Sequence, residues 1–531
     1  MKIRKFLFPV ITILMAAAVI FAIASGVILS ADYKEEIEVL EKSSTLEEKE
    51  YLAQGNMEIV ELDVSAAPVS SLSPSPTPTP APTPTLGPTP TTNPNPPESY
   101  EVGCLLTDAS TIRLTAEFSE VPSSDDGVLY VYQMAPYEYD INGTDARKVA
   151  ETEACENPSV AFPMTAREIP GLYCKYVFVS LRNGVLSMNG EPQYITNPEK
   201  TASGTHGLIQ YPASKKDMAG IFTNWDVQRK GAAKPIMQIC NYGENPVLRH
   251  PLANTADSYP PDAVMQYMLN ASNAAGVNAL IAAMREVGSM PGTQAYIIGN
   301  ELNVRKWCYV AYCGNQQYVR EYMQVFRVAY NAIKSVNADA QVFICIDQCW
   351  DRNMTNSEMY QFMDAKDFID EFNRLICAGG NINWSLAFHP HTVPLDYAAF
   401  WNVGSARDPI YASEVASGHM VTFQNMHIIT SYMQRAELLY NGNTRTMIAS
   451  EVGISQYPDE ASQRAALVAS YKMGQRNSLV KLMEYSQDFV FTYPPSVMDV
   501  YNNLGTGSAQ EAAYEAEALQ TIGISDWSQV H

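Results

Sequence analysis

The stretch Ala295-Tyr-Ile-Ile-Gly-Asn-Glu301 is an apolar run, rich in Ile, that ends in Gly-Asn-Glu. Such a run predicts a buried β-strand, and its ending puts the Glu301 carboxylate at the carboxyl end of that strand. Thr446-Met-Ile-Ala-Ser-Glu-Val-Gly453 repeats the design and puts Glu451 behind a second buried strand. The sequence therefore predicts two strand-end glutamates that lie 150 positions apart in the chain.

From about Lys215 onward, short apolar segments alternate with amphipathic ones. Repeated strand–helix units predict a parallel sheet with right-handed crossovers, and seven or eight units indicate an α/β protein with a TIM-like (β/α)8 barrel. Barrel enzymes collect catalytic groups from the carboxyl ends of several strands, which suits Glu301 and Glu451. The expected strands are 234–240, 263–269, 296–298, 341–346, 384–388, 446–449 and 479–483; the expected helices include 319–335, 359–376 and the closing helix 511–519.

One part of this barrel is crowded. Only 55 residues, 242–296, separate the first expected strand from the strand that leads to Glu301. Two full strand–helix units would barely fit into that length. We therefore expect the second strand to be short, irregular or missing, which leaves open whether the barrel is complete.

The residues before the barrel fall into four segments. Residues 1–31 join a basic start to a long uncharged apolar run, the pattern of an export signal; the length of the run favours an uncleaved membrane anchor, with cleavage near Ala22-Ile-Ala-Ser25 as the alternative. Residues 32–67 predict an acidic stalk, and 68–99 a Pro/Thr-rich linker of extended geometry. Residues 100–200 alternate Tyr- and Val-rich runs with turn signals and predict a small β-sandwich domain before the barrel domain, 210–531.

The formal net charge of -22 argues against a nucleic-acid partner, because that affinity depends on Lys and Arg neutralising phosphate. Export predicts an extracellular location, cell-surface anchored or secreted. The nine cysteines permit disulfides in that setting, and Cys308 with Cys313, or Cys345 with Cys349, are close pairs; buried free thiols are the alternative. No two Cys-x-x-Cys pairs occur, which disfavours a cysteine zinc site.

Residues from about Tyr100 to the end resemble clan A of the glycoside hydrolases, within a bacterial family catalogued as a domain of unknown function. The resemblance depends on the order and spacing of short motifs: Tyr194-Ile-Thr-Asn197, Gly299-Asn-Glu301, His389-Pro-His391 and Ser450-Glu-Val-Gly453. It departs at the crowded second-strand region and at His391, where an aromatic residue would be expected. The clan implies that an Asn-Glu pair ends strand four and a second Glu ends strand seven.

The resemblance implies that Glu301 is the general acid/base and Glu451 the nucleophile of a retaining glycosidase. The residue types agree, because this reaction needs two carboxyl groups about 5–5.5 Å apart. Glu301 would need a raised pKa, which burial beside Trp307 and Tyr296 would supply. Glu451 must stay ionised, and hydrogen bonds from His389, Asn300 or Tyr485 would favour that form. The alternative is that both glutamates are structural.

Six residues are expected to bind the carbohydrate substrate. The resemblance implies that Asn300 holds a sugar hydroxyl, and aromatic faces stack on sugar rings. His389 and His391 lie two apart after a strand, so both can face one way and contact substrate; a metal site would need a further ligand, and neither a metal nor a cofactor is expected. The expected substrate-binding residues are Asn300, His389, His391, Trp307, Trp350 and Tyr485. Asp347 and Asp351 are weaker candidates.

The sequence thus predicts an exported retaining glycoside hydrolase that acts on a polysaccharide or glycan. Two alternatives remain. A degenerate barrel on a stalk could be a cell-surface protein that binds glycan without cutting it. A metal-dependent hydrolase built on His389 and His391 is the third candidate.

Overall fold

The computed structural model describes residues 99–202, 204–222, 228–232, 236–243, 245–253, 265–311, 313–351, 363–403, 409–487 and 491–530. All described residues belong to one unit, Ser75–His531. The predicted export segment and acidic stalk, and all of the linker except residue 99, lie outside the described residues. Within the described ranges, no helix has the length and apolar character needed to span a bilayer.

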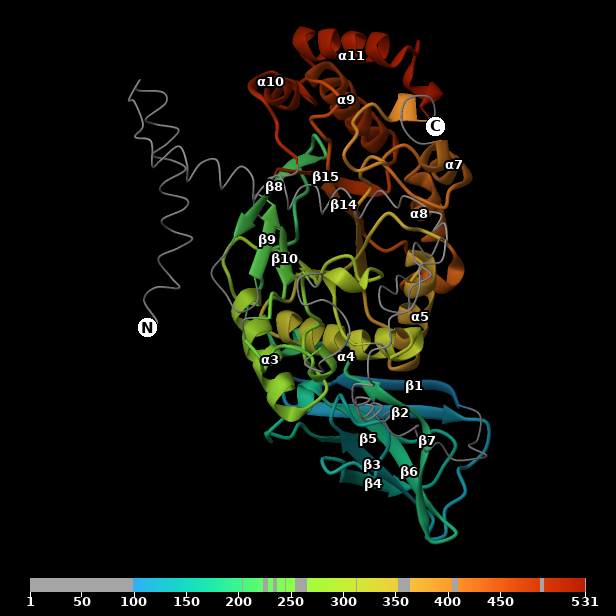
Figure 1. Ribbon diagram of the computed structural model, residues 1–531. Coiled ribbons are helices and arrows are strands. Elements are labelled where there is room, and N and C mark those ends of the chain that lie inside the picture. The colour runs from blue at the N-terminus through green and yellow to red at the C-terminus, as the bar shows by residue number, and fades with distance from the viewer. Residues whose placement is uncertain are drawn as a thin grey trace, which may run out of the picture. The chain divides into compact units, whose positions relative to one another are not determined.

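The β-rich segment forms two antiparallel sheets with strand orders β1-β2-β5 and β4-β3-β6-β7 (Figure 1). Every second side chain of β2 is buried, as its alternating sequence predicts. Phe118 and Phe178, from different sheets, meet edge to face with ring centroids 6.3 Å apart. The sandwich arrangement itself stays a prediction. The strands are β1 (Ser99–Leu106), β2 (Thr111–Phe118), β3 (Val128–Met134), β4 (Arg147–Glu153), β5 (Ser159–Pro163), β6 (Lys175–Arg182) and β7 (Val185–Tyr194).

Eight later strands close into a ring, in the order β8-β9-β10-β11-β12-β13-β14-β15. All of them except β9 run parallel and form one curled sheet. Counted from β8, β11 is the fourth strand and β14 the seventh. The strands are β8 (Lys216–Phe222), β9 (Gln228–Ala232), β10 (Ile236–Cys240), β11 (Ala295–Ile298), β12 (Gln341–Ile346), β13 (Trp384–Phe388), β14 (Met447–Val452) and β15 (Val480–Ser486).

Strand β9 supplies the barrel strand that could not be found in the short stretch before Glu301. This strand runs antiparallel to both neighbours, β8 and β10, and joins the two edges of the parallel sheet. Its polar sequence, Gln-Arg-Lys-Gly-Ala, contains no apolar run from which a strand could be predicted. The strand expected at 263–269 is wrong: its described residues make only isolated bridges, through Tyr267 and Leu269.

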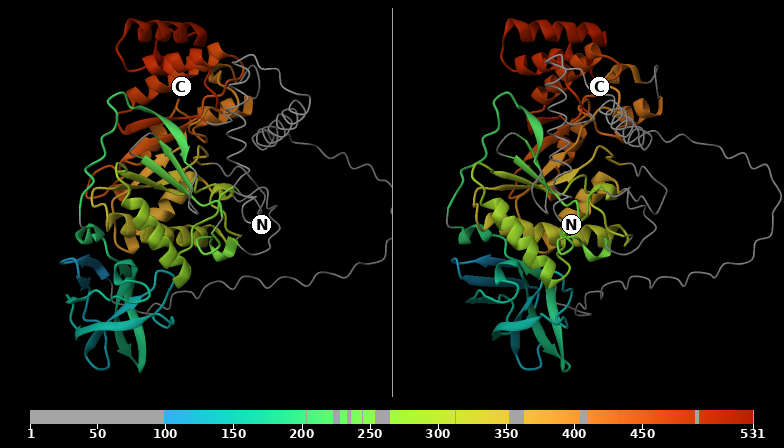
Figure 2. Two further views of the ribbon diagram at one scale, coloured as in Figure 1. Left: turned by 90° about the vertical axis from the view of Figure 1, so that its left-hand side faces the viewer. Right: turned by 60° about the vertical axis from the view of Figure 1, so that its left-hand side comes forward.

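Helices cover the outside of the parallel strands. Figure 2 shows α9 to α11, in red, on one side of the barrel, and α3 and α4, in yellow-green, toward the other. The predicted helices near 319–335, 359–376 and 511–519 are present as α4, α5 and α11, where the structure describes them. The helices are α3 (Ala274–Gly288), α4 (Asn315–Lys334), α5 (Ala365–Ala378), α7 (Pro409–Ser417), α8 (His427–Tyr432), α9 (Glu460–Arg476), α10 (Pro495–Asn503) and α11 (Ala509–Ile522).

Alternation along the strands separates the barrel interior from the helical layer, because successive side chains point to opposite faces. A small apolar cluster takes alternate residues from successive strands, which identifies it as the interior. Its members are Ile209, Ile236, Ala295, Ile297, Phe343, Cys345, Ala387, Ile448 and Leu482. The intervening residues, such as Tyr296 and Tyr485, pack in the larger core with the helices. Whether a strand-end side chain reaches the site therefore depends on its position in this alternation.

Candidate active site

The backbone turns sharply where β11 ends. Gly299 has φ +86° and Glu301 has φ +36°, so two residues within three adopt the left-handed region. Glycine reaches this region without strain, but a glutamate there costs on the order of 1–3 kcal/mol. The turn is fixed by backbone hydrogen bonds from Gly299 N to Ile239 O and from Leu302 N to Cys345 O, both 2.9 Å. The fold thus holds Glu301 in a strained conformation at the carboxyl edge of the barrel.

An irregularity in β14 sets the direction of the Glu451 side chain. The pairing of β14 with β15 shifts register between Ala449 and Val452, where two residues intervene on β14 and one on β15. Ala449 and Val452 both belong to the outer core, although three positions separate them, so the simple alternation breaks between them. Bulges of this kind re-aim side chains next to active sites. Here the break turns the Glu451 carboxylate toward His389.

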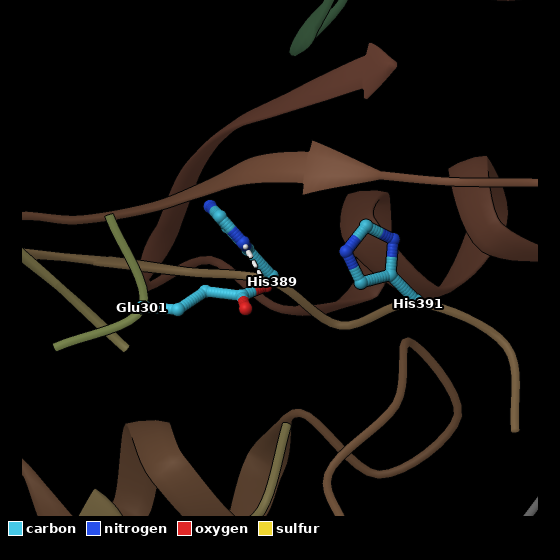
Figure 3. Close-up of side chains that lie close together, drawn as sticks. All are labelled: Glu301, His389 and His391. Carbon is cyan, nitrogen blue, oxygen red and sulfur yellow. Dashed lines mark hydrogen bonds and ion pairs between the residues drawn. The ribbon is translucent and has the colours of Figure 1, made fainter. Parts of the chain in front are cut away.

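His389 joins the two glutamates. It follows β13 and is fully buried, and its backbone N–H donates to Ile346 O. Its Nδ1 lies 2.9 Å from Glu301 Oε1 and 3.8 Å from Glu451 Oε2. Figure 3 shows the Glu301 side chain reaching from one segment toward the two histidines of another, with the contact to His389 dashed. The two carboxylate oxygens therefore cannot be farther apart than the sum of these two distances.

The other nitrogen of His389 contacts a thiol. Nε2 lies 3.2 Å from Cys345 Sγ, whose strand position places it in the barrel interior. Burial lowers the pKa of the His389 imidazole, but Cys345, Glu451 and Glu301 together raise that pKa well above its usual value. The structure therefore favours an imidazolium that donates Nδ1–H to Glu301 and Nε2–H to Cys345. A positive charge between the two glutamates compensates for burying them.

His391 is held in one tautomer. Its Nδ1 lies 2.8 Å from the backbone nitrogen of Gly453 and accepts that N–H, and its ring stacks on Phe491 at 5.6 Å between centroids. A Cβ on Gly453 would meet the Phe491 ring at 2.1 Å, so the Ser-Glu-x-Gly motif ends in glycine for steric reasons. Because Nδ1 accepts, neutral His391 carries its proton on Nε2 and presents a donor.

This tautomer bears on metal binding. One potential donor atom each of Glu301, His389 and His391 lie within 4.8 Å of one another, and among the described residues they form the group that could hold an ion. A histidine that binds a metal through one nitrogen usually donates from the other. At His391 the second nitrogen accepts a backbone N–H instead, so Nε2 keeps its proton and has no lone pair for a metal. These residues fit a hydrogen-bonded cluster better than a metal centre.

Asp347 adds a third carboxyl group beside the pair. It follows β12 and is nearly buried, and its Oδ1 accepts from Asn303 Nδ2 at 2.6 Å and from Cys349 N at 2.8 Å. Burial and the charge of Glu301 raise the pKa of Asp347 to about 6, despite these hydrogen bonds. Asp347 is therefore a third carboxyl group whose charge is coupled to the charge of Glu301.

Asn300 precedes Glu301, and the oxygen of its side-chain amide already accepts a hydrogen bond. It is buried, and Gln238 of β10 donates to its Oδ1 at 2.7 Å and to Gly299 O at 3.2 Å. Since Oδ1 accepts from Gln238, the Nδ2 group is the part of Asn300 that can donate to another molecule. The turn before Glu301 is thereby tied to the neighbouring strand.

Trp307 lies six positions after Glu301, in the segment that follows β11. It closes a short 3-10 helix, Arg305–Trp307, and its ring lies 5.3 Å from Lys306 Nζ. Burial lowers the pKa of Lys306, and the charge of Glu301 opposes that shift. Trp307 is partly exposed, and a small cavity reaches it from the β10 and β11 side.

Three residues expected at the site lie elsewhere. Trp350 is buried and packs edge to face on Tyr432 of α8, with centroids 5.0 Å apart. The Tyr485 hydroxyl hydrogen-bonds Ser470 of α9 at 3.0 Å, so the side chain faces the helices. Tyr296 donates toward Gly288 O and Thr293 O, also in the outer layer. The structure does not bring these three side chains into the cluster around His389.

Sequence reasoning missed Cys345, Gln238 and Asn303 as partners of the site. Cys345 and Gln238 lie on inward-facing positions of their strands, so strand alternation was the available signal. The disulfides that the sequence permits are not formed: all nine cysteines, including both close pairs, have free thiols. The alternative of unpaired thiols is therefore the one that the structure supports.

Comparisons with known proteins agree in part with these expectations. Residues 232–490, just under half of the chain, match a family described as "Family of unknown function (DUF5722)". A search of curated proteins gave no match.

Solved structures similar to this chain include a family 39 glycoside hydrolase from Bacteroides cellulosilyticus WH2, at 10% identity over 73% of this chain and 75% of that one, with a TM-score of 0.28. A GH128 (subgroup II) endo-β-1,3-glucanase from Sorangium cellulosum is 14% identical over 44% and 75%, with a TM-score of 0.25. A Paenibacillus polymyxa xyloglucanase from GH family 44 is 12% identical over 46% and 55%, with a TM-score of 0.29.

Proposed function

We propose that this protein is a retaining glycoside hydrolase that acts on a polysaccharide or glycan through Glu301 and Glu451. The observation that carries the proposal is the convergence of both carboxylates on His389 Nδ1 from the fourth and seventh strands of a closed ring. Two carboxyl groups that face one another across a sugar-sized gap are what double displacement needs. The clan resemblance drawn from the sequence expects the same two strands.

Glu301 suits the general acid. Its side chain is 15% exposed, against 9% for Glu451, so it exchanges protons with water more readily. Glu451 takes the role of the nucleophile, as the clan resemblance implies for the Glu that ends the seventh strand, and its Oε2 lies 3.8 Å from His389 Nδ1.

In the first step, Glu301 gives its proton to the glycosidic oxygen while Glu451 attacks the anomeric carbon, and the leaving sugar departs as an alcohol. In the second step, Glu301 takes a proton from water, and the hydroxide displaces Glu451 from the anomeric carbon. His389 stabilises whichever carboxylate is ionised at each stage. Asn300 Nδ2 and Trp307 are placed to bind a sugar hydroxyl and a ring face, respectively.

The proposal includes an extracellular location. The basic and apolar start of residues 1–31, the acidic segment and the Pro/Thr-rich linker would tether the described part outside a membrane. A surface of strong negative charge is suited to a neutral glycan substrate. Membrane attachment is thus part of the proposal and is tested by fractionation, separately from catalysis.

The test is hydrolysis of a panel of plant, fungal and bacterial polysaccharides, followed by proton NMR of the first-formed product. Retention predicts that the product initially has the anomeric configuration of the substrate. Glu451→Gln should reduce turnover by at least about 10³-fold and leave glycan binding largely intact, since the substitution keeps shape and removes the nucleophile.

The matched control is Glu153→Gln, which makes the same change at an exposed glutamate in β4. Inverted product would overturn the retaining mechanism, and unchanged turnover in Glu451→Gln would overturn the role of that residue. Glycan binding without any turnover across the panel would favour the alternative of a non-catalytic binding protein.

A further inference from the structure

A cavity of about 220 Å³ lies far from Glu301, where the β-rich segment packs on the barrel helices. Its walls come from three places: β6 and β7, helix α4, and the end of helix α5. Drug-sized ligand sites are roughly 300–1,000 Å³, so this cavity suits a smaller molecule. Its polar lining consists of Tyr139, Lys175, Glu191, Arg320, Gln324 and Arg374.

The charge of this lining is positive, in a protein whose net charge is -22. Lys175 is 7% exposed, and its Nζ lies 5.6 Å from the Tyr139 ring and 5.9 Å from the Tyr194 ring. Its Nζ donates to a backbone carbonyl, Glu138 O, and the carboxylates of Glu138 and Glu191 offset part of the cost of burying its charge. An anion in the cavity would add to this compensation.

Arg320 also indicates that the cavity can bind an anion. Its guanidinium lies over the Tyr139 ring, 5.4 Å from the centroid. Within the part of the chain that the structure describes, no carboxylate pairs with Arg320, whereas Arg374 on the same wall already binds Glu371 through two nitrogens. Arg320 therefore keeps its hydrogen-bond donors for a ligand. A carboxylate is the small anion that matches the planar fork of arginine.

The Gln324 side chain indicates that an anion alone would leave one polar group of the cavity without a hydrogen-bond partner. The side chain is 1% exposed, and its Oε1 has no hydrogen-bond donor among the described residues. The amide orientation is fixed, because the Tyr139 hydroxyl donates to Glu321 Oε1 at 3.2 Å and therefore accepts from Gln324 Nε2 at 3.0 Å. A buried acceptor left in this way costs stability unless a donor reaches it. An ionised carboxylate has no proton to give, so the ligand must also carry a hydrogen-bond donor, such as a hydroxyl.

We propose that this cavity binds a small polyhydroxylated carboxylate, of which a hexuronic acid unit is the natural example. The carboxylate meets Arg320 and Lys175, a hydroxyl donates to Gln324 Oε1, and the rings of Tyr139 and Tyr194 offer flat apolar surfaces to the sugar. This inference does not depend on Glu301 or Glu451. It assigns a second carbohydrate site to this positively charged cavity, in a protein whose net charge is negative.

The test is calorimetric titration of sodium glucuronate and galacturonate into the full chain, in the Glu451→Gln background so that turnover cannot interfere. We expect a dissociation constant of about 1 mM or lower, and binding at least tenfold weaker for glucose and for acetate, which each lack one recognised group. Arg320→Gln should weaken binding at least tenfold. Arg435→Gln, an exposed arginine paired with Glu437, is the matched control.

A second variant protects the test against misfolding. Gln324→Met keeps the size of the side chain and removes the acceptor, and it should weaken hexuronate binding while leaving acetate binding unchanged. Equal hexuronate affinity in the parent and Arg320→Gln, equal affinity for glucose and glucuronate, or no binding of either acid would each overturn the proposal. None of these outcomes depends on whether the protein hydrolyses a glycan.

Discussion

His389 donates to Glu301 through one ring nitrogen, 2.9 Å away, and contacts a thiol, Cys345 Sγ, through the other at 3.2 Å. Both ring nitrogens of a fully buried histidine are therefore engaged inside the barrel. The arrangement orients the imidazole and holds a positive charge 3.8 Å from Glu451 as well. Four predictions follow from this cluster and the strained turn beside it.

Replacing His389 tests the charge between the glutamates. His389→Asn keeps a short N–H donor and removes the cation that lies between the two carboxyl groups. The acidic limb of the kcat/KM pH profile, which reports the ionisation of the nucleophile, should move to higher pH by about one unit or more. His427→Asn, at an exposed histidine of α8, is the control. An unshifted profile would show that His389 does not tune Glu451.

Removing the thiol tests the partner of Nε2. Cys345→Ala leaves the buried Nε2–H of His389 without an acceptor, which should lower the free energy of unfolding by about 1–3 kcal/mol. Cys345→Ser keeps an acceptor oxygen and should recover part of that loss. Urea unfolding of the two variants and the parent measures the difference. If serine and alanine were equally destabilising, the contact would be one of packing alone.

Asp347 predicts a pH-dependent stability. Its pKa rises from 3.8 to about 6 in the folded protein, so the folded state holds this proton more tightly than the unfolded chain. The resulting stabilisation is complete below about pH 4 and is lost as the pH rises through 6. Asp347→Asn keeps the acceptor for Asn303 and Cys349 and never ionises. It should match the parent near pH 4 and exceed it by on the order of 3 kcal/mol at pH 7.

The comparison is made by denaturant unfolding of both proteins at several pH values between 4 and 7. Titrating groups remote from Asp347, such as Glu321, act on both proteins and cancel in the difference, whereas the coupling of Asp347 to Glu301 is part of the difference that is measured. A constant difference across this range would contradict the raised pKa of Asp347.

The backbone of Glu301 predicts a conflict between stability and function. Glu301→Gly and Glu301→Ala both remove the carboxylate, but only glycine adopts φ +36° without strain. The glycine variant should be more stable than the alanine variant by about 1 kcal/mol, whereas turnover should be abolished in both. Thermal unfolding and activity measured together check this. A glycine variant less stable than the alanine variant would mean that the turn stores no strain.

Much of the barrel could be predicted because its central strands are continuous apolar runs. The expected strands 341–346 and 384–388 coincide with β12 and β13. β9 reads Gln-Arg-Lys-Gly-Ala and carries no apolar signal, whereas β8 was not expected although Met-Ala-Gly-Ile-Phe follows its Lys-Asp start. The antiparallel closure depends on strands that pair across the ring. The wrong strand at 263–269 arose from apolar residues that only make isolated bridges.

The site was predictable to the extent that it follows strand ends. Glu301, Asn300 and His389 were found in this way, and the structure brings them together with Glu451. Tyr485 was misjudged because it faces outward on β15, toward Ser470 of α9. The aim of Glu451 depends on an irregularity in β14 that no local pattern shows. Trp350 failed for another reason: an aromatic after a strand is as easily a buried side chain as a sugar platform.

The two carboxylates sit on strands so far apart in the chain that a cut between β13 and β14 would give each fragment one of them. Neither fragment would hold a pair of acids, and only docking of the two pieces into one ring could recreate it. Catalytic activity at this centre therefore requires the assembled barrel. It should be lost when the barrel is split and should return when the two complementary fragments reassociate.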